Sequence, residues 1–110
     1  MTDRAKKYLV DILHSISLIE DFLIGTEGFE LYRQDLKTKS AVERQLGIIG
    51  EAVNQFQKEE SSVQFSSARQ IISFRNRIIH AYDSIDDSIV WVILRKHIPI
   101  LKQEAAEALN

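Results

Sequence analysis

Apolar residues recur at helical spacing along almost the whole chain, and this periodicity most limits what the sequence can fold into. From Tyr8 to Phe22, and again from Val42 to Phe56, they follow at short intervals that give each segment one apolar face. The chain has only four glycines and one proline, and no strand-like alternation competes with the helical pattern. The sequence therefore predicts an all-α fold.

The pattern predicts an antiparallel up-and-down helical bundle of four main helices, in a single domain covering residues 1–110. The expected helices run over Asp3 to Leu23, Leu36 to Gln57, Ser66 or Ser67 to Tyr82, and Asp87 to Ala108, with a short extra helical turn over Phe29 to Arg33. Pro99 lies inside the last pattern and should kink that helix or break it into two pieces.

Specific packing expectations follow from the same pattern. Gly47 and Gly50 each cost about 1 kcal/mol in a helix interior, so we expect another helix to approach closely there and Glu51 to have a buried or interfacial partner. The expected core residues of the last two helices are Ile71, Phe74, Ile78, Ile79, Ile89, Trp91, Val92, Ile98 and Leu101.

Composition excludes several classes of protein. Cysteine is absent, which excludes a disulfide framework and a thiolate metal site and favours a cytoplasmic location. The first ten residues are too charged for a signal peptide, and no apolar run is long enough to span a membrane, so no membrane association is expected. The net charge of −2 does not indicate a nucleic-acid-binding protein, which usually has an excess of basic residues. Any site for a polyanion therefore has to be a local cluster of basic residues.

The segment RNRIIHAYD, residues 75–83, departs from the ordinary helical composition around it. Arg75 has apolar helix neighbours, so its guanidinium must snorkel, pair with a carboxylate or face a groove. Gln70, Ser73, Arg77 and His80 form a polar strip along the same helix. Arg75 and His80 are five positions apart, about 140° on an ideal helix, so they do not point the same way.

These residue types suit cleavage of a phosphodiester by the ribose 2′-hydroxyl. Histidine transfers protons near neutral pH, arginine stabilises a phosphate that gains charge, and an amide such as Asn76 can orient either. The three histidines lack close ligand spacing, so no metal site and no cofactor are expected. A purely structural ion-pair network, with Asp83 or Asp86 as the partner of Arg75, also fits the residues alone.

Residues 75–80 resemble the Arg-polar-x-x-x-His signature of the HEPN superfamily, and with Tyr82 they give the Arg-x4-His-x-Tyr motif of HepT-like toxins. The segments DRAKKYLVDILHSISLIEDFL, AVERQLGIIGEAV and DSIDDSIVWVILRKHIPIL look like the same family in the expected order.

The resemblance implies a HEPN-like bundle that forms a homodimer and acts as a metal-independent endoribonuclease on RNA, either tRNA or mRNA. It implies the toxin of a type VII toxin–antitoxin system, silenced by an MntA-like minimal nucleotidyltransferase that AMPylates the motif tyrosine. By the motif, Arg75 and His80 are catalytic, Asn76 supports them and Tyr82 is modified, while Arg77 either binds phosphate or is merely solvated. The alternative function is a non-catalytic partner subunit of the nucleotidyltransferase.

Other polar and aromatic residues receive structural expectations. His14 and His97 are expected to be surface or structural residues, and Tyr8, Tyr32 and Trp91 to serve packing. Arg44 and Glu51 lie seven positions apart on one helix face, which permits a supporting pair, an interface role or ordinary surface charge.

Overall fold

The computed structural model describes residues 1–80 and 85–110, and throughout these residues the chain forms helices and loops without a strand. The elements in chain order are α1 (Asp3–Phe22), α2 (Phe29–Gln34), α3 (Leu36–Glu59), α4 (Ala68–His80), α5 (Asp87–Val92), the π-helix η2 (Ile93–His97) and α6 (Ile98–Leu109). The predicted all-α bundle is confirmed. Tyr82 and Asp83 lie outside the described residues.

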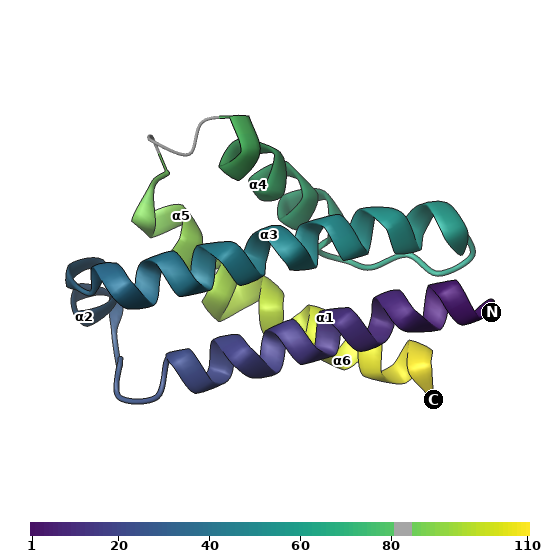
Figure 1. Cartoon of the computed structure of the whole chain (residues 1–110), viewed down its shortest axis with the longest axis horizontal. Coiled ribbons are helices and arrows are strands. Elements are labelled where there is room, and N and C mark those ends of the chain that lie inside the picture. Colours follow the sequence, from purple (N-terminus) through teal and green to yellow (C-terminus); the bar gives the residue numbers. More distant parts are fainter. Residues whose placement is uncertain (81–84) are drawn as a thin grey trace.

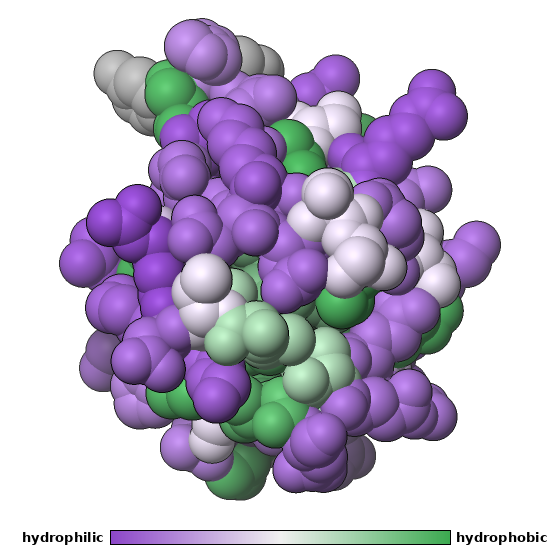
Figure 2. Space-filling model, turned by 90° about the vertical axis from the view of Figure 1, so that its right-hand side faces the viewer, coloured by the Kyte–Doolittle hydropathy of each residue, from purple (hydrophilic) through white to green (hydrophobic). Residues whose placement is uncertain are grey.

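The long helices run up and down (Figure 1). α1 and α3 are antiparallel neighbours, α4 packs on the other side of α3, and α6 packs along α1, so both termini lie at one end of the bundle. Seen from that end, the surface is mainly hydrophilic around a small apolar patch (Figure 2). None of the described helices is both long and apolar enough to cross a membrane.

The core is built from the apolar faces of α1 and α3. The predicted apolar faces of both helices turn inward. The buried residues among them are Leu9, Ile12, Ile16 and Ile19 in α1 and Val42, Leu46, Ile49, Val53 and Phe56 in α3, while Tyr8 and Phe22 are partly buried. Thr2 caps α1 by accepting from the backbone N–H of Ala5 at 3.0 Å, and Asp35 caps α3 by accepting from that of Thr38 at 3.1 Å. Local capping and periodicity therefore agree with the tertiary packing.

The short helix α2 covers one end of this core. Tyr32 is fully buried, and its ring lies 5.4 Å from that of Trp91, centroid to centroid. Phe29 also contacts Trp91, at 6.3 Å between centroids. The packing role predicted for Tyr32 and Trp91 is confirmed.

The last predicted helix is divided as Pro99 suggested. Pro99 lacks the N–H that would bond the carbonyl of Arg95, and it stands in the first turn of α6, where that loss costs little. The turn before it is a π-helix, in which Ile98 N–H bonds the carbonyl of Ile93. The interruption of the α-helical pattern is therefore accommodated by a π-helical turn directly before α6.

Three core predictions in this half of the chain are wrong. Ile89 is 38% exposed, Val92 52% and Ile79 50%, whereas Val90, Ile93 and Leu94 are buried instead. α5 is only six residues long and is held through Val90 and Trp91, so Ile89 and Val92 are left on an open side. Ile79 faces away from the core of the single chain.

Candidate functional site

The position of Arg75 is set by a close approach between α3 and α4. A Cβ placed on Gly50 would lie 2.9 Å from Arg75 Cγ and 3.2 Å from the carbonyl oxygen of Ile71, with Arg75 Cβ closer still. Only glycine allows this contact without displacing the backbone. The close approach expected near the two glycines is thus confirmed at Gly50, whereas Gly47 has open space around it.

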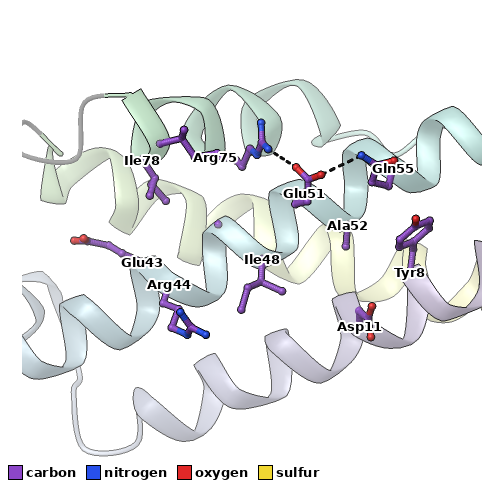
Figure 3. Close-up of a pocket in the computed structure, with 12 residues that line it drawn as sticks. Tyr8, Asp11, Glu43, Arg44, Ile48, Glu51, Ala52, Gln55, Arg75 and Ile78 are labelled. Carbon is purple, nitrogen blue, oxygen red and sulfur yellow. Dashed lines mark hydrogen bonds and ion pairs between the residues drawn. The ribbon is translucent and has the colours of Figure 1, made fainter.

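Arg75 is the centre of a short polar network (Figure 3). Its guanidinium forms an ion pair with Glu51 of α3. It also donates from Nη1 to Asn76 Oδ1 at 2.8 Å. Glu51 in turn accepts from Gln55 Nε2 at 3.0 Å. The prediction that Arg75 pairs or faces a groove is confirmed, and so is the interfacial partner expected for Glu51.

One nitrogen of the guanidinium is buried without a hydrogen-bond partner in the part of the chain that the structure describes. Arg75 Nε is buried and has no hydrogen-bond acceptor among the described residues. A buried donor without an acceptor is costly and calls for a partner. Because Nε is buried, an acceptor on RNA or on another chain can reach this N–H only if the Arg75 side chain shifts.

A groove of about 610 Å³ lies beside this network, between α1, α3 and α4. We call it the Glu51 groove; its lining residues are Tyr8, Asp11, Glu43, Arg44, Gly47, Ile48, Glu51, Ala52, Gln55, Arg75, Ile78 and Ile79. Ile48 and Ile79 give it exposed apolar surface, and its lining includes three carboxylates and two guanidiniums. Arg44 lies in this groove but points away from Glu51, whose partner is Arg75 (Figure 3).

The remaining motif residues occupy other sides of α4. Asn76, Arg77 and His80 are exposed, and His80 lies about one and a half turns beyond Arg75. Within one chain the structure therefore joins Arg75 to Asn76 but not to His80. The predicted modification site, Tyr82, lies outside the described residues.

A second groove, of about 470 Å³, lies on the opposite flank of α4, against α5 and η2. We call it the His97 groove; it is lined by Gln70, Ser73, Phe74, Arg77, Ser88, Ile89, Val92, Ile93 and His97. Three members of the predicted polar strip, Gln70, Ser73 and Arg77, thus face one cavity. The inclusion of His97 was missed from the sequence, because it depends on how η2 packs against α4.

His97 is held by a specific contact. Its Nδ1 lies 2.7 Å from Ser67 Oγ, at the start of α4. Burial, helped by the nearby charge of Lys96, lowers the pKa of the His97 imidazole below its ordinary value. The ring is therefore oriented and favours its neutral form near pH 7, whereas His14 is an exposed surface residue.

Two further groups, one in α2 and one near the start of α3, have shifted pKa values. Burial raises the pKa of Glu43, with a further contribution from the charge of Asp87, and burial also raises the pKa of Tyr32. Asp87 is itself ion-paired with Lys39 at 2.7 Å. In residues 1–80 and 85–110, no three His, Asp or Glu side chains lie together as a candidate metal site.

Comparison with known proteins gives a consistent result. The family model described as "Ribonuclease HepT-like" matches residues 12–108. A protein of Thermococcus cleftensis named "Probable ribonuclease HepT" is 38% identical over 101 residues, which cover 88% of each chain. A Caldanaerobacter subterraneus protein named "Putative RNase" is 31% identical over 109 residues, 96% of this chain and 94% of its own. No solved structure gives a significant match.

Proposed function

Because the chain belongs to the HepT-like ribonuclease family, we propose that it is an endoribonuclease that acts as the toxin of a toxin–antitoxin pair. The observation that carries the proposal is the Arg75–Asn76 pair, held at a fixed place by the Gly50 contact and followed on the same helix by an exposed His80. The names of the relatives in Thermococcus cleftensis and Caldanaerobacter subterraneus support ribonuclease chemistry.

The proposed reaction is attack by a ribose 2′-hydroxyl on the adjacent phosphorus. One imidazole accepts the 2′-hydroxyl proton, the bond from phosphorus to the 5′-oxygen breaks, and a second imidazole protonates that oxygen. The products are a 2′,3′-cyclic phosphate and a 5′-hydroxyl. Arg75 stabilises the charge that develops on the phosphoryl oxygens, and the chain supplies this chemistry without a metal ion.

This reaction needs two proton-transfer groups, whereas one chain has a single motif histidine. We therefore propose a homodimer in which a two-fold axis brings two copies of His80 and Arg75 to one linkage. The Glu51 groove favours such an interface, because it combines exposed apolar residues with charges of both signs. Ile79 in this groove directly precedes His80, so a second copy seated there would lie against the end of α4 that carries the motif.

Regulation is proposed to act on Tyr82. An MntA-like nucleotidyltransferase would attach AMP to the Tyr82 hydroxyl, adding a bulky anion two residues after His80. The added volume and charge would keep RNA from the motif. Intact mass spectrometry after co-expression with the nucleotidyltransferase should show additions of AMP on the wild type and none on Tyr82→Phe.

The central test compares RNA cleavage by purified wild type, His80→Ala and Arg75→Ala. We expect cleavage to end in a 2′,3′-cyclic phosphate and to be lost in both variants, while sedimentation shows the same dimer. A mixture that forms dimers of one His80→Ala chain and one wild-type chain should also lose activity, because one imidazole is then missing. AMP-free wild type that cuts no cellular RNA, yet binds the nucleotidyltransferase, would favour the non-catalytic partner role instead.

A further inference from the structure

We propose that the His97 groove is a subsite for one nucleotide of the RNA substrate next to the scissile linkage, with Arg77 contacting its phosphate and His97 its base or ribose. This inference rests on the proposed ribonuclease function and adds a substrate-binding surface to it. The first argument is continuity along α4. Gln70, Ser73 and Arg77 line the groove at spacings of three and four, and His80 follows Arg77 by three residues on the same side of the helix.

The groove has the chemistry that a nucleotide requires. Its floor is apolar, because Phe74 and Ile93 are almost fully buried, and Ile89 and Val92 extend it as exposed apolar surface. Polar groups surround this floor: an amide at Gln70, hydroxyls at Ser73 and Ser88, a guanidinium at Arg77 and an imidazole at His97. An apolar surface with a few convergent polar groups, in a volume of about 470 Å³, is typical of small-molecule sites.

The two grooves differ in the charged side chains that line them. The Glu51 groove is lined by three carboxylates and two guanidiniums, which suits a protein surface with both signs of charge. Among its described lining residues the His97 groove has Arg77 and no carboxylate. Asp86 lies close enough to Arg77 to feel its charge, but it caps α5 by accepting from both N and Oγ of Ser88. A polyanion is therefore better accommodated in the His97 groove.

The imidazole of His97 is held in one orientation, with its other ring nitrogen left to contact a ligand in the groove. Ser67 Oγ holds Nδ1 at 2.7 Å, which fixes the ring and leaves Nε2 as its remaining polar atom. The ring sits at the end of the π-helix η2, a form of helix that occurs often at functional sites. The Ser67 contact acts on the orientation of the ring, so Ser67 is a positioning residue in this proposal.

Two substitutions of His97 distinguish a ligand contact from a structural role. Asn can replace the Nδ1 contact with Ser67 but has no group at the Nε2 position, whereas Gln reaches the Nε2 position but does not reproduce the Nδ1 contact. Binding is measured by fluorescence anisotropy with a pool of short 2′-O-methyl oligoribonucleotides, which lack the nucleophile and are not cleaved. We expect His97→Asn to raise the Kd about 2- to 10-fold, the loss of one hydrogen bond, and His97→Gln to stay nearer to wild type.

Two charge variants test the phosphate contact. Arg77→Gln should weaken binding about tenfold and lower the slope of log Kd against log salt by about one, whereas the matched variant Arg4→Gln on the exposed start of α1 should change neither. Ser73→Asp places a carboxylate in the groove and should weaken binding more than Ser17→Asp, which adds the same charge at an exposed site of α1.

The outcomes separate this inference from the proposed function. If wild type cleaves RNA while Arg77→Gln and Ser73→Asp bind like their controls, the subsite is wrong and the ribonuclease proposal survives. A His97→Gln variant that binds worse than His97→Asn would show that His97 only supports the fold, and would overturn its assigned contact. Cleavage that is absent from wild type refutes the ribonuclease proposal, and absence of oligoribonucleotide binding then refutes the subsite as well. Melting temperatures of all variants identify any loss of binding caused by unfolding.

Discussion

The two interior glycines of α3 should respond in opposite ways to the same substitution. Gly47 and Gly50 occupy the same helix three residues apart, and each would gain about 1 kcal/mol of helix propensity as alanine. Outside the neighbouring backbone of its own helix, no atom of the described residues lies within 4 Å of a Cβ added at Gly47, so Gly47→Ala keeps that gain. Gly50→Ala places its methyl 2.9 Å from Arg75 Cγ and 3.2 Å from the Ile71 carbonyl oxygen.

The cost at Gly50 follows from what surrounds it. Overpacking of this kind costs about 1–3 kcal/mol, and a change of side-chain rotamer cannot relieve it, because the contact includes Arg75 Cβ and a backbone oxygen. After subtraction of the gain in helix propensity of about 1 kcal/mol, we expect Gly50→Ala to lose up to about 2 kcal/mol of unfolding free energy. The two variants should then differ by the overpacking cost alone, about 1–3 kcal/mol, or roughly 5–15 °C in Tm for a domain of this size.

Thermal unfolding followed by circular dichroism measures this difference. The scans are run at several protein concentrations, including one at which sedimentation shows a monomer, because Gly47 lines the Glu51 groove and dimer dissociation makes Tm depend on concentration. Displacement of Arg75 in Gly50→Ala should also lower the rate of RNA cleavage. Equal stability of the two variants in the monomer would refute the close contact between α3 and α4.

Three further predictions concern charged groups around the two grooves. Glu51→Gln should change the unfolding free energy by less than about 1 kcal/mol, because its ion pair with Arg75 is partly exposed. The same variant should have a lower KM for RNA, because the phosphate no longer competes with a carboxylate for the Arg75 guanidinium. An unchanged KM would argue against this competition. The lowered pKa of His97 means that the unfolded chain binds a proton more readily, so stability should be complete above about pH 6.5 and fall as the pH drops below it. Urea titrations should show a flatter response in this range for His97→Asn. Asp86→Ala should lower the unfolding free energy by about 1 kcal/mol, because it removes the N-cap of α5. Asp86→Ser should retain most of that free energy, because serine also caps helices. An equal loss in both variants would exclude capping as the cause.

The sequence alone determined the features that depend on neighbours along the chain. Helical periodicity gave the bundle, the buried faces of α1 and α3 and the short helix at Phe29, because a residue three or four positions away is a spatial neighbour in any helix. The same reasoning identified the polar strip of α4 and the unusual position of Arg75. A glycine inside the α3 pattern predicted a close contact with another helix, although the sequence did not say that this helix is α4.

Only the tertiary structure decided which groups meet across helices. The pairing of Arg75 with Glu51, and the placement of His97 in the same groove as Arg77, depend on how α3, α4 and η2 are packed. Periodicity also failed for Ile89, Val92 and Ile79, because it marks a residue as apolar without saying whether the single chain has anything to cover it. Helix phase is a local property, whereas partners and burial are set by the arrangement of whole helices in space.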